Sequence, residues 1–357
     1  MPEPLKLQDI KQRMASYGLR PHKQFGQNFL ADFNMLRAIV ADAEVDAGDC
    51  VVEIGTGAGS LSGLLCDAAG LVITVEIDRG MFSFSREVLE SCPNVVQVRC
   101  DALERSGLNP ALLELLRGYL ETGEIGGASG PLAYRADAKS DFEVASNLPG
   151  PAPRCGRLKM VANLPYSVAT AILFALLETR LPFERMVVML QHEVGEKLSA
   201  RPGDSEWGIP GLLVSRLAKV RMIRKVPAKV FWPKPRVDSA LVEVIPHDQV
   251  DMVAFARLRE LTHVLFQHRR KSVSNAMALA LGVSNAQAAT WLIAKGARPA
   301  DRTEDLLPDT IQALADDPQI GPLVRKAHNK SADQLLAKAE KKARRAAWQK
   351  RVYGEEE

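Results

Sequence analysis

The chain has 357 residues with 46% apolar and 25% charged side chains, which excludes a disordered chain and predicts a globular protein of two domains, or of one large domain with appendages. A formal net charge of +3 is too small to indicate a nucleic-acid partner by itself. The N-terminus has no signal-peptide pattern, no apolar run reaches the roughly 18 residues of a membrane span, and the five cysteines form no Cys-x-x-Cys pair, so we expect a cytoplasmic protein with reduced thiols and no membrane contact.

Short apolar runs alternate with helical patterns through the first 200 residues. The runs VVEIG, LVITVEI and NVVQVRC come first, and the alternation resumes with LKMVANLPY and MVVML. Such alternation predicts an α/β fold with a parallel sheet that is covered on both faces. Residues 104–157 interrupt it: 110–120 is typical of a helix, and the remainder is rich in Gly, Pro and Ser, which we interpret as a partly mobile surface insertion.

The character of the chain changes near residue 250. Residues 217–245 predict a strand, a proline-rich turn and a second strand, whereas only helical patterns follow. We therefore expect a first domain over 1–248 and a helical RNA-binding domain over 249–325. The basic, Ala-rich stretch 326–357 is interpreted as a solvated or disordered tail, with an RNA-binding arm as the alternative.

A glycine loop and two acidic residues follow the first three apolar runs. The loop contains Gly55, Gly57 and Gly59, whose G-x-G-x-G spacing differs from the G-x-G-x-x-G of dinucleotide-binding proteins. Glu76 ends the second run, where a carboxylate can accept hydrogen bonds from both ribose hydroxyls of a nucleoside. Asp101 ends the third run, where a carboxylate can accept a hydrogen bond from an adenine amine. The set predicts a nucleoside ligand without a required phosphate, such as S-adenosylmethionine. A tight turn with solvated acids is the structural alternative.

The motif Asn163-Leu164-Pro165-Tyr166 ends the fourth run and precedes a helix. The amide oxygen of Asn163 and a main-chain carbonyl can accept the two hydrogens of an adenine amine, which makes its nitrogen more nucleophilic, while Tyr166 can stack on the base. The similar Asn147-Leu148-Pro149 lacks the aromatic residue and the following helix, so we reject it as the site.

These motifs together resemble the ribosomal RNA adenine dimethyltransferases, and most closely the bacterial small-subunit branch whose loss gives kasugamycin resistance. The matching segments are KQFGQNFL (23–30), VEIGTGAGSLS (52–62), VEID (75–78), DAL (101–103), ANLPYSVAT (162–170), VFWPKPRVDSA (230–240) and FQHRRKSVSNAM (266–277). The resemblance implies a class I, Rossmann-like methyltransferase fold with a mostly parallel seven-stranded sheet and a small C-terminal all-α domain. Three features depart from the family pattern, namely Thr56 in place of proline, the long 104–157 insertion and the basic tail beyond about residue 328.

The resemblance also implies roles for individual residues. The S-adenosylmethionine donor would contact Asn28, Leu30, Gly55, Gly57, Glu76, Asp101 and Asn163. The target adenine would contact Asn163, Pro165, Tyr166 and Phe231, with Phe231 and Tyr166 on opposite faces of the base. The expected products are two adjacent N6,N6-dimethyladenosines in a 3′-terminal hairpin of 16S rRNA, made by a monomer that needs no metal and acts on the small ribosomal subunit.

Basic residues gather in two stretches that could contact RNA phosphates. They are Arg221, Arg224, Lys225, Lys229, Lys234 and Arg236, and then Arg269, Arg270 and Lys271. Solvated surface charge is the alternative. The rival functions are a large-subunit (23S) adenine dimethyltransferase, a non-catalytic ribosome-assembly factor and, least supported, a nicotinamide-dependent dehydrogenase.

Overall fold

The computed structural model describes residues 7–21, 27–105, 107–125 and 142–327. The chain divides into two compact units. The first comprises Met1–Ser199 and Leu217–Asp248, and the second comprises Ala200–Arg216 and Gln249–Glu357. Residues 23–26 of the first matching segment, part of the insertion and the basic tail from 328 onward lie outside the described residues.

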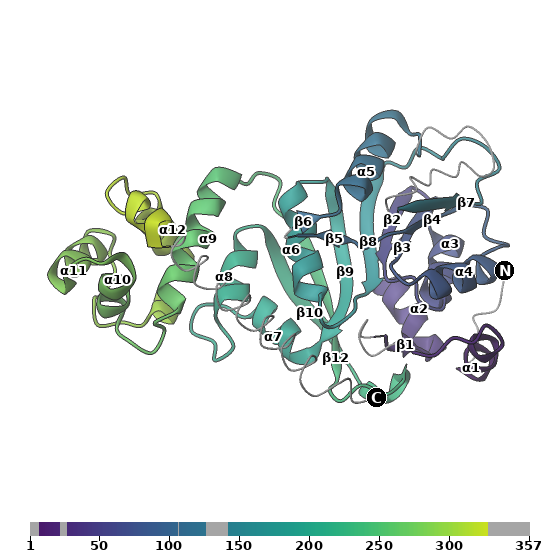
Figure 1. Ribbon diagram of the computed structural model, residues 1–357, viewed down its shortest axis with the longest axis horizontal. Helices are drawn as coiled ribbons and strands as arrows, with labels where there is room; N and C mark the ends of the chain where they lie inside the picture. The colour runs from purple at the N-terminus through teal and green to yellow at the C-terminus, as the bar shows by residue number, and fades with distance from the viewer. Residues whose placement is uncertain (1–6, 22–26, 106, 126–141, 328–357) are drawn as a thin grey trace, which may run out of the picture. The chain divides into compact units, whose positions relative to one another are not determined.

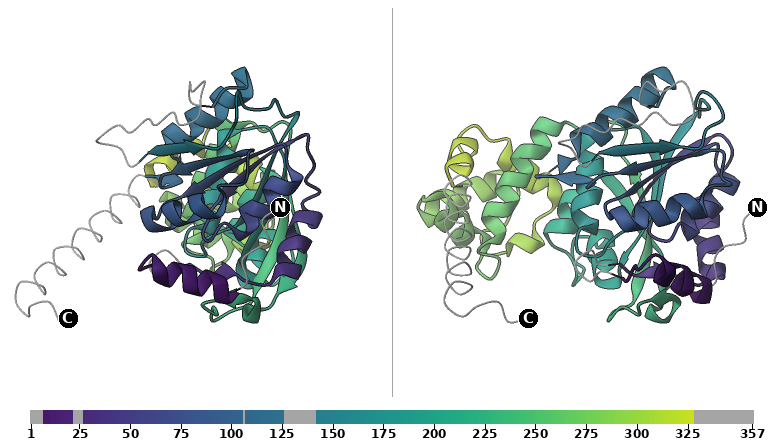
Figure 2. Two further views of the ribbon diagram at one scale, coloured as in Figure 1. Left: turned by 90° about the vertical axis from the view of Figure 1, so that its right-hand side faces the viewer. Right: turned by 45° about the vertical axis from the view of Figure 1, so that its right-hand side comes forward.

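The first unit is an α/β layer structure whose helices lie on both sides of a twisted sheet (Figures 1 and 2). Its helices are α1 (Leu7–Ser16), α2 (Phe33–Asp42), α3 (Ser60–Ala68), α4 (Arg79–Val88), α5 (Pro110–Thr122), α6 (Ala169–Thr179) and α7 (His192–Ser199). The strands of the main sheet are β2 (Asp49–Ile54), β3 (Leu71–Glu76), β4 (Val95–Arg99), β7 (Glu143–Ser146), β8 (Arg157–Asn163), β9 (Phe183–Gln191), β10 (Ala218–Val226) and β12 (Ser239–Pro246). The unit also contains two separate strand pairs. One pairs β1 (Phe29–Leu30) with β11 (Phe231–Trp232), which follows the 3-10 turn η2 (Ala228–Val230). The other pairs β5 (Leu103–Glu104) with β6 (Gly107–Leu108).

The main sheet has the order β10-β12-β9-β8-β2-β3-β4-β7. The five strands from β9 to β4 are parallel, whereas β12, β10 and β7 run antiparallel to their neighbours. All six residues of β2 and of β3 are buried, and four of the six in each strand are apolar, as expected for strands covered on both faces. The predicted α/β fold with a mostly parallel central sheet is confirmed.

The insertion differs from the expected surface excursion. The helix predicted at 110–120 is present as α5, which begins at Pro110 and ends before Gly123 in a left-handed conformation. Residues Glu143–Ser146, however, form β7 and pair with β4, so the main sheet has eight strands among the described residues where seven were expected. The Gly- and Pro-rich composition around it concealed this short edge strand.

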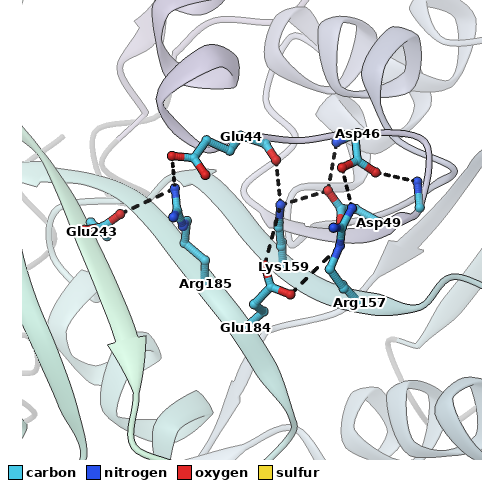
Figure 3. A network of polar contacts seen from close by, with 9 residues as sticks. Glu44, Asp46, Asp49, Arg157, Lys159, Glu184, Arg185 and Glu243 are labelled. Carbon is cyan, nitrogen blue, oxygen red and sulfur yellow. Dashed lines mark hydrogen bonds and ion pairs between the residues drawn. The ribbon is translucent and has the colours of Figure 1, made fainter.

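A polar network lies at the amino ends of the central strands, away from their carboxyl ends (Figure 3). The buried Asp49 carboxylate contacts Lys159 Nζ at 3.0 Å and Arg157 Nε at 2.7 Å. Lys159 also donates to the Glu44 main-chain carbonyl at 2.6 Å, and Arg185 contacts the Glu44 carboxylate at 2.8 Å. These contacts connect β2, β8 and β9 to the turn after α2 and fix the amino edge of the sheet.

The second unit is helical. It contains α8 (Ile209–Ser215), α9 (Met252–Phe266), α10 (Val273–Leu281), α11 (Asn285–Ala294), the 3-10 turn η3 (Thr303–Asp305) and α12 (Pro308–Ala315). Its interior is formed by apolar side chains of these helices, including Phe255, Leu258, Met277, Leu292 and Ile311. No single helix in the described ranges is long and apolar enough to cross a membrane; the bent pair Val273–Leu281 and Asn285–Ala294 passes that test only when its two helices are taken together.

Candidate active site

A cavity opens at the carboxyl ends of β2, β3, β4 and β8, where the last residues of these parallel strands lie along one edge of the sheet. Eight of the ten residues predicted for the site line it: Asn28, Gly55, Gly57, Glu76, Asp101, Asn163, Pro165 and Tyr166. The cavity also has apolar walls, which suit the uncharged parts of a nucleoside.

The glycine loop requires glycine for two physical reasons. Gly55, Gly57 and Gly59 have φ values of +92°, +52° and +76°, a region that side chains disfavour. A Cβ at Gly57 would also lie 3.2 Å from the Phe29 ring. Thr56, one of the departures from the family pattern, is buried, and its hydroxyl forms a 2.6 Å hydrogen bond with Thr74 Oγ1 on β3. The loop is therefore anchored to the neighbouring strand by a side chain that proline could not supply.

Glu76 is a buried carboxylate at the end of β3, with 5% of its surface exposed. Its Oε2 accepts from the Gly57 N–H at 2.9 Å and its Oε1 from the Asp78 N–H at 2.9 Å. Burial raises the pKa of Glu76, and the backbone N–H groups of Asp78, Gly57 and Ile77 oppose that shift. A carboxylate has about four acceptor sites, so acceptor capacity remains for hydroxyl donors such as those of a ribose.

Asp101 follows β4 at the mouth of the cavity and is exposed. Its Oδ1 accepts from the Leu103 N–H at 2.9 Å, which fixes the carboxylate relative to the β5–β6 hairpin. The neighbouring Cys100 and Ala102 are buried and also line the cavity. An acceptor with apolar neighbours on both sides is suited to the amine edge of a purine.

Asn163 ends β8, and its amide has a fixed orientation. Its Nδ2 donates to the main-chain carbonyl of Asn28 at 3.0 Å, so its Oδ1 is the acceptor that remains for a ligand. Tyr166 follows in the same motif, and its hydroxyl forms a 2.5 Å hydrogen bond with the buried Ser239 on β12. Burial raises the pKa of Tyr166, so the phenol stays protonated, and the hydrogen bond to Ser239 holds the ring in place.

Leu30 and Phe231 do not line the cavity. They face each other across the antiparallel β1–β11 pair, and both are buried, 4% exposed each, in the same hydrophobic cluster as α2 and α3. The pairing brings the QNFL segment to the FWP segment about 200 residues later in the chain. In this structure the two side chains pack in the core behind the cavity. The predicted contacts of Leu30 with the methyl donor and of Phe231 with the target adenine remain predictions.

Several residues that line the cavity were not predicted from the sequence. Phe29, Ile77 and Cys100 are examples. Ile77 is an apolar side chain that is 41% exposed, and its position directly after Glu76 was an available signal. Phe29 and Cys100 likewise adjoin predicted residues, but their apolar character resembles that of any core position.

The rejected motif at Asn147 has a structural role. Its Nδ2 donates to the carbonyls of Leu89 at 2.8 Å and Cys92 at 3.2 Å, so it closes the turn after α4. It does not line the cavity. Among the described residues, no group of three or more His, Cys, Asp or Glu side chains is arranged to hold a metal ion.

Comparison with known proteins agrees with this geometry. A family model described as ribosomal RNA adenine dimethylase matches residues 18–316. The chain is 35% identical over 315 residues to ribosomal RNA small subunit methyltransferase A of Streptomyces griseus, covering 86% of this chain and 93% of that relative. It is 36% identical over 296 residues to the protein of that name from Moorella thermoacetica, covering 81% and 89%.

A solved structure supports the fold independently. A dimethyladenosine transferase from Plasmodium falciparum matches with a TM-score of 0.58 at 21% identity, covering 82% of this chain and 98% of that one. A family match over most of the chain, together with relatives at this identity, shows that the chain belongs to the ribosomal RNA adenine dimethylases and is an S-adenosylmethionine-dependent methyltransferase.

Proposed function

We propose that this enzyme dimethylates the N6 amines of two adjacent adenosines in a 3′-terminal hairpin of 16S rRNA, within the small ribosomal subunit. The observation that carries the proposal is the Asn163 amide, held by the Asn28 carbonyl so that its oxygen remains to accept from an amine. The relatives named as small subunit methyltransferases support the choice of ribosomal subunit.

Three parts of the cavity suit the methyl donor. Glu76 would accept hydrogen bonds from the ribose hydroxyls, and Asp101 would accept one from the adenine amine. The main chain of Gly55 and Gly57 would lie against the methionine part. Asn28 would complete this side of the cavity, with Leu30 supporting it from the core. When bound, S-adenosylmethionine supplies an electrophilic methyl group on a positively charged sulfur.

The Asn163–Tyr166 motif would hold the target base. The amide oxygen of Asn163 would accept one amine hydrogen, and a main-chain carbonyl of the motif the other, so the nitrogen lone pair is less delocalised into the ring. Pro165 restricts the backbone that presents this carbonyl. Tyr166, fixed through Ser239, would stack on the base, and Phe231 would reach its other face only after leaving its buried position. Positioning of the amine and its acceptors is the main contribution to rate.

The wider setting belongs to the same proposal. The enzyme would act in the cytoplasm as a monomer, with the helical unit binding ribosomal RNA. Arg269, Arg270 and Lys271 follow α9 as exposed side chains, and none forms an ion pair with a described residue, which supports an RNA-facing role.

The test is methyl transfer to purified particles. Small subunits from cells lacking this gene are incubated with labelled S-adenosylmethionine, and their nucleosides are then identified by mass spectrometry. We expect N6,N6-dimethyladenosine in 16S rRNA; label confined to 23S rRNA would instead indicate the large-subunit reaction. If the wild type and Asn163→Ala both bind small subunits but transfer equally little methyl, the chain is an assembly factor.

A further inference from the structure

A second groove, distinct from the cavity of the active site, adjoins it and is basic. It lies between α1 with its following turn and the segment after β11, and it shares Gln27 and Asn28 with the active-site cavity. Four cations and one indole line it, namely Lys11, Arg20, Lys234, Arg236 and Trp232. None of the side chains that line it is acidic.

The charges of these four residues, hereafter the groove cations, are not neutralised by the protein. Within the part of the chain that the structure describes, none of the four forms an ion pair with a carboxylate. Neighbouring basic residues of the same stretch behave differently: Arg221 contacts Glu243 at 2.8 Å, Arg224 contacts Asp42 at 2.6 Å and Lys225 contacts Asp238 at 3.1 Å. Three of the six basic residues predicted to contact RNA from that stretch are thus engaged within the protein, and the unpaired charge is concentrated in the groove and at Lys229.

Trp232 holds one of the groove cations in position. Its ring stacks on Phe29, with centroids 6.1 Å apart and planes inclined by 28°. Lys11 Nζ lies 5.1 Å from the centroid of the indole. A cation–π contact leaves the formal charge available to an anion, whereas a carboxylate would neutralise it.

We infer that this groove binds the phosphodiester backbone of the RNA strand that flanks the target adenosine. The inference rests on the proposed function for the identity of the strand, since the groove meets the site at Asn28, beside the amide of Asn163. An extended polyanion matches four unpaired cations in one groove better than a small anion does, because it offers several phosphates to them. The groove would hold the strand while the target base occupies the cavity.

The experiment measures how RNA affinity depends on salt. The full-length protein binds a fluorescently labelled hairpin RNA of the 16S 3′ end between about 50 and 200 mM salt, a range over which phosphate contacts dominate the change. Each single substitution, Lys11→Gln, Arg20→Gln, Lys234→Gln or Arg236→Gln, should lower the slope of log affinity against log salt by about 0.7 and affinity at 0.1 M salt about fivefold. The matched control is Lys219→Gln, an exposed cation on β10 that does not line the groove and should leave the slope at its wild-type value.

The location of the contact is tested with neutral linkages. Methylphosphonates placed on either side of the target adenosine should weaken binding by the wild type and have no further effect on the variant lacking all four groove cations. The inference is overturned if that variant changes the slope by less than about one, if Lys219→Gln changes it as much as the single substitutions do, or if the variant keeps full sensitivity to the neutral linkages. Normal binding of free RNA but weak binding of whole particles would also overturn it and assign the groove to an acidic protein partner.

The two proposals can fail separately. If wild-type enzyme does not methylate small subunits but the groove substitutions lower the salt slope, the proposed substrate is wrong and the groove still binds RNA. If methylation occurs and the slope is unchanged, only the groove assignment is wrong. Calorimetric binding of S-adenosylmethionine, which should be unaffected in every groove variant, checks that each protein is folded.

Discussion

Removal of the Asn163 amide should abolish most of the methyl-transfer rate without unfolding the protein. The amide donates to the Asn28 carbonyl at 3.0 Å, a hydrogen bond whose net contribution to stability is about 1 kcal/mol. The amide oxygen of Asn163 is proposed to accept a hydrogen bond from the target amine as the nitrogen–methyl bond forms. Such a group stabilises the transition state by about 3 to 4 kcal/mol. We therefore expect Asn163→Ala to lower kcat roughly 100- to 1,000-fold and to lower the free energy of unfolding by only about 1 kcal/mol.

The assay is single-turnover methyl transfer to unmodified small subunits, with donor affinity measured separately by calorimetry. Asn147→Ala is the matched control, because that side chain also donates to main-chain carbonyls, at 2.8 and 3.2 Å, but lies outside the cavity. The control should lose stability and keep its rate. A rate for Asn163→Ala within about threefold of the wild type, far short of the loss expected for an acceptor at the reacting amine, would refute this reasoning.

Three further predictions concern buried ionisable side chains. Glu76→Gln should weaken donor binding about 10- to 100-fold by calorimetry, because its NH₂ group would face one of the two N–H donors at 2.9 Å. Burial raises the pKa of Glu53 from 4.5 to about 8, so the folded protein keeps a proton that the unfolded chain releases, and the free energy of unfolding should fall as pH rises through that window. Glu53→Gln should reduce this slope by up to about 1.4 kcal/mol per pH unit in urea unfolding; an unchanged slope would contradict the assignment. Lys159→Met should cost about 3 kcal/mol of stability in the same assay, because Asp49 loses one of its two cations, while donor affinity stays at the wild-type value.

The strand-end residues could be predicted from the sequence because parallel strands impose a simple rule. Gly55, Glu76, Asp101 and Asn163 each follow an apolar run, and runs that are buried on both faces become neighbouring parallel strands. Their carboxyl ends then meet at one edge, whatever the length of the connections between them. The path from Asp101 to Asn163 therefore did not need to be known, although its described part contains the β5–β6 pair and β7, the additional strand of the main sheet.

The pairing of surface charge could not be predicted in the same way. Arg221 faces Glu243 because the β10–β12 register places them directly opposite, and Arg224 reaches Asp42 on a helix 182 residues away in the chain. Both depend on three-dimensional neighbours that composition does not encode. A basic stretch in the sequence thus overestimates the charge available to RNA, and only the structure separates Lys234 and Arg236 from the paired arginines.

The orientation of the Asn163 amide shows why a motif alone does not define a site. The group that orients the amide is the main-chain carbonyl of Asn28, so the contact could not be predicted from the side chain at that position. That carbonyl is held in place because the next two residues, Phe29 and Leu30, pair with Trp232 and Phe231. The QNFL and FWP segments therefore act on the amide through backbone geometry, in addition to any contact that their side chains make with ligand. Substitutions that disrupt the β1–β11 pair should therefore disturb the orientation of the Asn163 amide, even where the altered residues are buried and do not line the cavity.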